Sequence, residues 1–194
     1  VEGAKEFVGS RIFAFHKPDY IRKGKVNYTQ FDDPDFFTVV PATTFDADDT
    51  NLLFITEQST YALRISALSG KVGQEHYPPN YARTPLKGIE AWEFSLGKTN
   101  ISPQKAASKK IFANDSRMHA LAKRNGKLWA AHHVFLPEGM ENVDRTAVQW
   151  WNLETNATII QRGYIQDTNA VKQYTFPSMA VNKNGDVLIG YSGF

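Results

Sequence analysis

One hairpin pattern occurs twice in the chain. The stretches MHALAKRNGKLWAAHHV and PSMAVNKNGDVLIGYSG each place an Asn-Gly pair between two runs rich in apolar residues. Asn-Gly between such runs is the strongest short-range signal for a β-hairpin, because the central residues of a type I′ turn need positive φ. A third stretch, ATTFDADDTNLLFITEQ, matches the pattern more loosely around an acidic turn. The chain is therefore predicted to consist of repeated antiparallel sheets.

Alternation of apolar and polar residues predicts strands along most of the chain. Turn-forming residues separate them, and the polar stretches 20–35, 71–88 and 97–110 are predicted to be irregular connections. The predicted strands lie at 8–16, 36–45, 52–58, 61–68, 89–96, 118–122, 127–135, 146–153, 158–165, 176–181 and 187–191.

The grouping of these strands predicts an all-β fold of the β-propeller class. Four-stranded blades are expected over about 36–96 and 112–166, with a partial blade at 176–194. Because propellers close with about four to eight blades, we expect residues 1–194 to form a single propeller domain or part of a larger one. The start at Val1 rather than Met fits a processed or trimmed product. The alternative is a small four-bladed ring closed by its terminal strands.

Composition excludes several classes of protein. The hydrophobic fraction of 42% is that of a folded globular domain, and the net charge of +2 with dispersed basic residues gives no footprint for nucleic acid. The absence of Cys excludes disulfides, thiolate metal sites and a Cys nucleophile. No apolar run approaches the roughly 18 residues of a membrane span.

The C-terminal half carries a succession of short motifs. In chain order they are PQ at 103–104, NDSR at 114–117, RNGKLWAAH at 124–132, AVQWW at 147–151, FPSMAVN at 176–182, GD at 185–186 and GYS at 190–192. This succession resembles a group of uncharacterised bacterial β-propeller proteins, mostly predicted to be exported, whose fold is similar in outline to that of six-bladed sialidases. FAFHK at 13–17 and VPATTFD at 40–46 extend the resemblance into the N-terminal half. It implies a propeller fold and an extracellular or periplasmic location, without a particular activity.

Three polar residues spaced by two form the candidate ligand site. If the strand begins early enough, Asp115, Arg117 and His119 share one face near the start of an inner strand, which in a propeller lies toward the central channel. An Arg flanked by a carboxylate and an imidazole can hold an anionic or sugar ligand by bidentate hydrogen bonds. The alternative is an Asp-Arg pair that braces adjacent blades.

His132 is the fourth candidate ligand-binding residue. It is adjacent to His133, so the two imidazoles point to opposite faces of a strand and cannot chelate one metal together. Both lie among apolar neighbours, which favours a buried histidine bonded to a neighbouring blade over a ligand-binding one.

An oxygen-rich turn is the candidate metal site. Ca²⁺ takes about six to eight oxygen ligands, but the Gly and the distal Glu of an EF-hand loop are missing here, and a plain turn is favoured. The candidate ligands are Asp46, Asp48, Asp49 and Asn51.

Taken together, these patterns predict an exported binding or scaffold module rather than an enzyme. Its expected partners are a glycan, another protein or the remaining blades of the same propeller, with no nucleic acid and no membrane span. The alternative function is a glycan-active hydrolase, which needs two converging carboxylates. The repeated Asp box and the arginine triad of sialidases are not found in the sequence, which disfavours that alternative.

Overall fold

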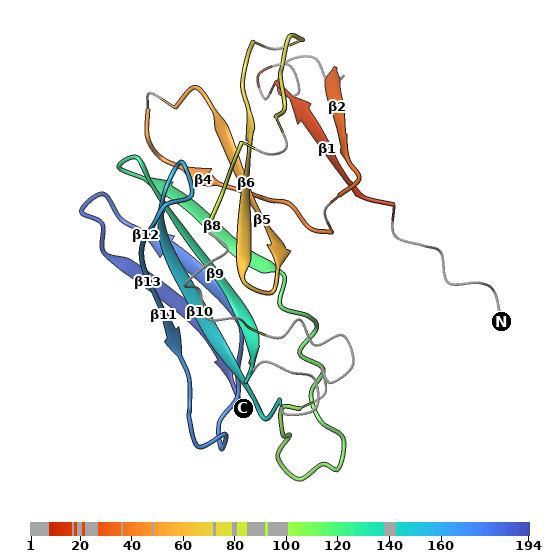
Figure 1. Ribbon diagram of the computed structural model, residues 1–194, viewed down its shortest axis with the longest axis vertical. Coiled ribbons are helices and arrows are strands. Elements are labelled where there is room, and N and C mark those ends of the chain that lie inside the picture. The colour runs from red at the N-terminus through yellow and green to blue at the C-terminus, as the bar shows by residue number, and fades with distance from the viewer. Residues whose placement is uncertain are drawn as a thin grey trace, which may run out of the picture.

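The computed structural model of the protein describes residues 8–16, 18, 21, 27–35, 37–47, 49–71, 73–78, 81–84, 92, 101–137 and 143–194. Every element bounded within these residues is a β-strand, and the strands form four sheets (Figure 1). The predicted all-β class is therefore confirmed. None of these sheets closes on itself.

The central sheet has five strands in the order β11-β10-β9-β8-β4. Four of them form the predicted antiparallel meander: β8 (Met118–Arg124), β9 (Lys127–Leu136), β10 (Arg145–Glu154) and β11 (Ile159–Ile165). Asn125 and Gly126 have φ angles of 52° and 71°, as a type I′ turn requires. The four strands predicted between 118 and 165 are thus confirmed, each within two residues of its predicted bounds.

A second sheet comes from the N-terminal half and has the order β3-β5-β6-β7. Its strands are β3 (Val40–Pro41), β5 (Leu52–Ser59), β6 (Ala62–Leu68) and β7 (Ala82–Arg83). The prediction of one strand at 36–45 is wrong, because the chain leaves this sheet after β3. It continues as β4 (Thr43–Thr44), which pairs in parallel with β8 of the central sheet. Pro41, which has no N–H for a ladder, marks the division.

Two further predictions concern the end of this sheet. The segment 71–88 was predicted to be irregular, yet it contains β7, which pairs with β6 through Arg83 and Ala82. The strand predicted at 89–96 lies outside the described residues except for Trp92, which is fully buried.

The N-terminal hairpin corrects another prediction. β1 (Ser10–Phe15) has the expected alternation, with Arg11, Phe13 and Phe15 exposed. It pairs with β2 (Tyr28–Asp33), which lies in the stretch 20–35 predicted to be a loop. That stretch looked like a loop because β2 has the sequence YTQFDD, in which an alternating strand is made largely of polar residues.

The C-terminal hairpin consists of β12 (Tyr174–Val181) and β13 (Val187–Gly193), close to the predicted bounds. Its turn differs from the first Asn-Gly turn, because Gly185 has a φ of 88° whereas Asn184 is not among the residues with positive φ. Instead, the side-chain oxygen of Asn182 accepts hydrogen bonds from the backbone N–H groups of Asn184 and Asp186, each at 2.9 Å.

The central sheet is covered on both faces. On one face, Leu128 and Val134 of β9 belong to the same apolar core as Ile55 of β5 and Ile65 of β6. On the other face, β12 contacts β8 and β9. Three sheets therefore lie in successive layers, and the β1–β2 hairpin lies apart from the β12–β13 hairpin, beside the second sheet (Figure 1).

Candidate functional site

Asp115 and Arg117 lie directly before β8 and form an ion pair. Arg117 donates from Nε to Oδ1 and from Nη2 to Oδ2 of Asp115, both at 2.6 Å, and its backbone N–H donates to Oδ1 at 3.1 Å. Burial opposes the ionisation of Asp115, but the hydrogen bonds from Arg117 outweigh it, and the pKa of Asp115 lies below its usual value. Asp115 is therefore an ionised carboxylate, and both of its oxygens accept hydrogen bonds from Arg117.

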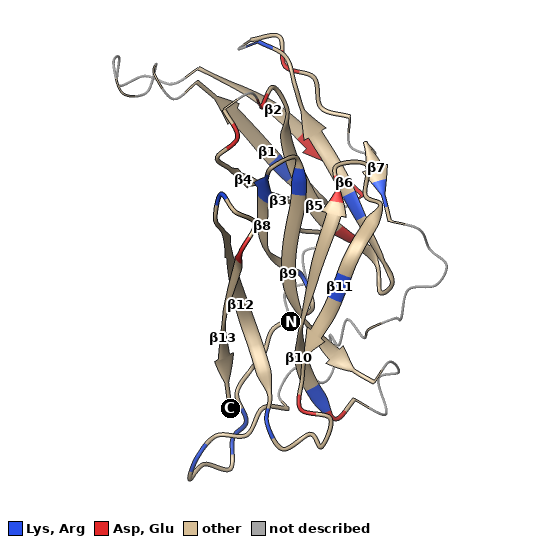
Figure 2. Ribbon diagram, turned by 90° about the vertical axis from the view of Figure 1, so that its left-hand side faces the viewer, with Lys and Arg blue, Asp and Glu red and all other residues tan. Residues whose placement is uncertain are grey.

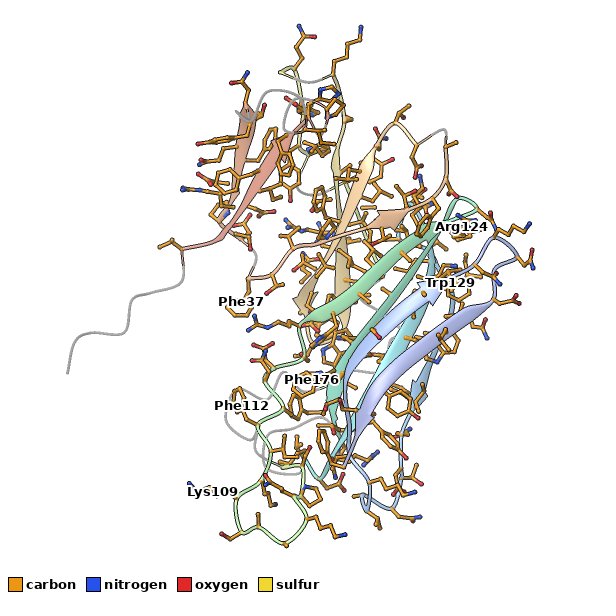
Figure 3. All side chains as sticks on the ribbon, turned by 180° about the vertical axis from the view of Figure 1, so that it is seen from behind. Phe37, Lys109, Phe112, Arg124, Trp129 and Phe176 are labelled. Carbon is orange, nitrogen blue, oxygen red and sulfur yellow. The ribbon has the colours of Figure 1, made fainter. Side chains whose placement is uncertain are left out.

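The guanidinium of Arg117 also lies over an aromatic ring. Its Cζ is 4.4 Å from the ring centroid of Phe37, which Figure 3 labels. The side chain of Arg117 is 31% exposed, against 5% for Asp115. Among the described residues, the side-chain hydrogen bonds of Arg117 come from Nε and Nη2, and part of the side chain is open to solvent.

His119 packs away from the ion pair. The pairing register of β8 with β9 shifts between Met118 and Ala120, and the His119 ring lies 4.9 Å from that of His133 and 6.0 Å from that of Phe176. Burial, aided by repulsion from neighbouring positive groups, lowers the pKa of His119 to about 4 and that of His133 to about 3. The structure thus joins Asp115 to Arg117 and places His119 in a separate aromatic contact.

His132 points to the opposite face from His133 and into the layer between the two large sheets. Its Nδ1 lies 2.8 Å from Oε1 of Glu57 and 2.8 Å from the carbonyl oxygen of Ser116, while its Nε2 accepts a hydrogen bond from Nε1 of Trp151 at 3.2 Å. Both atoms beside Nδ1 are oxygen acceptors, so Nδ1 carries a proton and donates it toward Glu57 and Ser116. His132 therefore links β9 to the neighbouring sheet.

The network continues beyond His132 on both sides. Oε1 of Gln149 lies 2.9 Å from Nε2 of His132, and Nε2 of Gln149 donates to the hydroxyl of Tyr164 at 2.9 Å. At the other end, the hydroxyl of Ser116 donates to Oε2 of Glu57 at 3.2 Å. Buried polar groups are costly unless they are bonded, so this network holds its members in one arrangement.

Glu57 is the residue that the sequence analysis missed. Burial raises its pKa, and the opposing hydrogen bond from His132 only reduces the effect. A signal was present, because Leu53, Ile55 and Glu57 share one strand face, and the first two belong to the core. An acidic residue on the inward face of a buried strand needs an explanation, and that alone could have singled out Glu57.

A small cavity adjoins both Glu57 and Arg117. Its volume is about 30 Å³, which is enough for roughly one water molecule. The residues that line it are Phe37, Thr38, Thr56, Glu57, Arg117 and Met118. The site therefore combines a partly exposed Arg side chain, a buried carboxyl group and two threonines around a space for about one water molecule.

The candidate calcium turn holds other partners in this structure. Asp46 accepts the backbone N–H groups of Asn125 and Gly126, at 3.1 and 3.2 Å, and Asp49 accepts hydrogen bonds from Thr44 and Lys123. The predicted ligand Asp48 lies outside the described residues, and no partner is recorded for the Asn51 side chain within them. Among the described residues, no three or more His, Asp or Glu side chains are grouped so as to hold a metal ion.

No protein-family model, curated protein or solved structure matches the chain. The described segments contain no helix that is long and apolar enough to cross a membrane. Basic and acidic residues are dispersed along the described ribbon (Figure 2). The candidate site must therefore be interpreted from its own geometry.

Proposed function

We propose that the protein is an exported bacterial binding or scaffold module with a β-propeller architecture, and that Arg117 holds an anionic group of its ligand. The observation that carries the proposal is that the Arg117 side chain is held in one orientation by its neighbours. One edge is fixed by Asp115 and one face by Phe37, while the side chain lines the cavity and remains partly exposed. An Arg held in this way loses little conformational freedom when it binds an anion.

The propeller part of the proposal is supported by the stacking of the sheets. Successive antiparallel sheets pack face to face, as blades do around a propeller axis. The motif resemblance of residues 103–194 points in the same direction. A glycan or another protein is the proposed ligand, and further blades are proposed to cover the exposed face of the β12–β13 hairpin.

A glycan array with neutral and acidic oligosaccharides tests the binding site. The parent protein is expected to bind acidic members, and Arg117→Ala is expected to lose this binding. Arg11→Ala is the matched control, because Arg11 also donates through Nε and Nη2 to one carboxylate, that of Asp32, away from the site. Equal binding by the parent and Arg117→Ala would show that Arg117 is not the ligand site, and a parent that binds no array member would remove the glycan from the proposal.

A glycan-active hydrolase is the second candidate. It is favoured by one observation: the charge of Asp115 contributes to raising the pKa of Glu57, whereas the pKa of Asp115 itself is lowered, chiefly by Arg117. Such a pair can divide the roles of general acid and base. The binding module is preferred because Arg117 occupies both oxygens of Asp115 and because each oxygen of Glu57 already has an internal hydrogen bond.

Chromogenic aryl glycosides test the hydrolase directly. A hydrolase would release the chromophore, and both Glu57→Gln and Asp115→Asn would abolish the release. We expect no turnover above that of a buffer control. Turnover that both variants abolish would replace the binding proposal with the enzymatic one.

Calcium binding at the turn 46–51 has a separate test. Addition of millimolar CaCl₂ would raise the Tm if the turn gathered enough oxygen ligands, because a ligand of the folded state alone stabilises it. We expect no change, because Asp46 and Asp49 are already bonded to protein donors.

A further inference from the structure

Four Asn residues begin the tripeptide Asn-x-Ser/Thr that N-glycosylation requires. They are Asn27, Asn100, Asn114 and Asn156. In a folded protein, an enzyme that modifies Asn must reach both the amide and the hydroxyl-bearing residue of the tripeptide. An acceptor is therefore expected in an exposed loop rather than in a paired strand or a core.

Asn156 lies in the loop that connects β10 to β11. Asn156 and Thr158 are both exposed, and Oδ1 of Asn156 accepts a hydrogen bond from the backbone N–H of Thr158 at 3.0 Å. Nδ2, the atom that a sugar would modify, takes no part in this bond. The loop is closed by two backbone hydrogen bonds of 2.9 Å, from Ala157 to Glu154 and from Glu154 to Thr158. Both residues that the modification requires are therefore open to solvent.

Two of the other tripeptides contain a buried Ser. Ser102 and Ser116, which follow Asn100 and Asn114 by two positions, are both 0% exposed. Asn100 itself lies outside the described residues. In the folded protein, neither hydroxyl group can be reached by an enzyme.

The tripeptide at Asn27 is exposed at its first residue but runs into a strand. Thr29 belongs to β2, which pairs with β1, and its hydroxyl donates to Glu75 at 2.8 Å. Access to this tripeptide would require the strand pair and the side-chain hydrogen bond to open. Exposure therefore favours Asn156 over the other tripeptides.

A second, independent feature distinguishes the same tripeptide. Glu154 precedes Asn156 by two positions, so the motif is extended to Glu-x-Asn-x-Thr. The other three tripeptides have no acidic residue at this position, which is occupied by Lys25, Lys98 and Phe112. Bacterial oligosaccharyltransferases take acceptors of the extended form Asp/Glu-x-Asn-x-Ser/Thr. The motif therefore suits the enzyme that an exported bacterial protein would meet.

We propose that Asn156 is an N-glycosylation site, to which an oligosaccharyltransferase transfers an oligosaccharide from a lipid diphosphate carrier. Nδ2 attacks C1 of the first sugar and forms an N–C bond, while one proton leaves Nδ2. The C1–O bond to the diphosphate breaks, and its electron pair stays on the lipid diphosphate, which is the leaving group. This inference rests on the export proposed above, because the carrier presents its oligosaccharide outside the cytoplasm.

The loop lies away from the candidate ligand site. Glu154 pairs with Lys127 beside the β8–β9 turn, whereas Arg117 precedes the opposite end of β8 (Figure 1). β8 has seven residues, a length of roughly 20 Å in a strand. An oligosaccharide on Asn156 is therefore expected to leave the cavity beside Arg117 open. The end of the sheet also stays exposed when other sheets pack on its faces.

Transfer in vitro to the purified, folded protein tests this proposal. The protein is incubated with a solubilised bacterial oligosaccharyltransferase and its lipid-linked oligosaccharide. Intact mass and peptide mass spectrometry then measure and locate the product. We expect one oligosaccharide per chain, on Asn156 alone. A synthetic peptide of residues 150–162 serves as the unfolded acceptor.

Two variants separate the tripeptide from the loop that carries it. Thr158→Ala removes the hydroxyl group of the tripeptide and should abolish the transfer. Thr155→Ala changes a neighbouring loop residue outside the tripeptide and should leave the transfer unchanged. Equal transfer to Thr158→Ala and to the parent would overturn the assignment. The location of the product in the parent needs no variant, so the test stands even if one of them does not fold.

The remaining outcomes separate this inference from the export on which it rests. Transfer to the peptide but not to the folded protein would mean that the loop is closed to the enzyme, and absence of transfer to both would mean that the motif is no acceptor; either result overturns the proposal. Transfer to Asn27 or Asn114 in the folded protein contradicts the selection by exposure. Fractionation of the source cells tests export separately. Protein found in the cytoplasm would overturn the export, and with it the natural modification, even if Asn156 accepts the oligosaccharide in vitro.

Discussion

Two Arg–Asp pairs, each joined by two N–H···O hydrogen bonds, lie in opposite environments. Arg11 and Asp32 have exposed fractions of 57% and 56%, whereas Arg64 and Asp33 are each only 1% exposed. Asp32 and Asp33 are consecutive in β2, so strand alternation alone sends one outward and one inward. The hydroxyl of Tyr77 also donates to Asp33 at 2.9 Å.

Substitution of the two arginines separates their contributions. Arg64→Leu leaves the carboxylate of Asp33 buried without its cation, which is expected to lower the free energy of unfolding by about 3–5 kcal/mol. Arg11→Leu removes an exposed pair worth less than about 1 kcal/mol. Urea unfolding of both variants measures the two losses in free energy of unfolding. If the loss for Arg64→Leu is as small as that for Arg11→Leu, Asp33 finds another partner or becomes protonated in the variant.

The buried imidazoles predict a loss of stability in acid. The pKa values of about 4 for His119 and about 3 for His133 lie below the ordinary value of about 6.5. Below pH 6.5 the unfolded chain binds more protons than the folded one, so stability that is complete above this pH falls as the pH decreases toward 3. Glu57 acts in the opposite sense, because its raised pKa gives stability that is lost as the pH rises through that value.

The contribution of His133 can be isolated by a variant. His133→Gln cannot titrate, so its free energy of unfolding should decline less between pH 7 and pH 4 than that of the parent, measured by urea unfolding at each pH. The carboxylates are common to both proteins and cancel in the comparison. His76→Gln, at an exposed position, is the control, and a parent-like decline in His133→Gln would argue against a buried neutral imidazole.

At the scale of elements, the two Asn-Gly turns show what local sequence can and cannot predict. Both connect hairpin strands, as the pattern predicts. Only the first turn has positive φ at both residues, and there Asp46 accepts the backbone N–H groups of Asn125 and Gly126. In the second turn, the side-chain oxygen of Asn182 accepts the backbone N–H of Asn184 instead. The sequence thus identifies a hairpin, while the turn type depends on the acceptor that lies beside it.

Matched substitutions distinguish these turns. Asn125→Ala removes the short polar side chain that makes a φ of 52° tolerable for a residue with a Cβ, which costs up to about 1–2 kcal/mol. Asn125 also donates from its side chain to the carbonyl oxygen of Lys183 at 3.0 Å, and this bond is lost. Asn184→Ala should change the midpoint of urea unfolding by much less, and equal effects would contradict the different backbone conformations.

The strands that sequence predicted well are those whose alternation is made by apolar residues. β9 and β10 bury most of their residues, and apolar residues recur along both strands, so their bounds were readable. β2 was missed because polar residues form its alternation. β4 was predicted as part of one strand with β3, because its two Thr residues carry no pattern that separates them. Such short or polar strands are defined by their partners rather than by periodicity.

At the scale of the whole molecule, the candidate site arises from the packing of two sheets. Sequence spacing brought Asp115 and Arg117 together because they are near neighbours in the chain. It could not show that Glu57 of β5 meets His132 of β9, since alternation predicts which face of a strand is buried but not which sheet covers that face. The sequence therefore predicted the Asp115–Arg117 pair and could have marked Glu57 as a buried acid, but it could not place Glu57 against His132.

The layered arrangement also predicts where a core substitution costs stability. Leu128 on β9 is 0% exposed between two sheets, whereas Leu188 on β13, the outermost hairpin, is 73% exposed. Leu128→Ala is expected to lower the free energy of unfolding by about 2–5 kcal/mol, and Leu188→Ala to change it by less than about 0.5 kcal/mol. Urea unfolding at several protein concentrations measures both. A cost above about 1 kcal/mol for Leu188→Ala would mean that another sheet covers β13 in solution, as a neighbouring blade does in a closed propeller, and a cost that grows with concentration would identify that cover as a second copy of the protein.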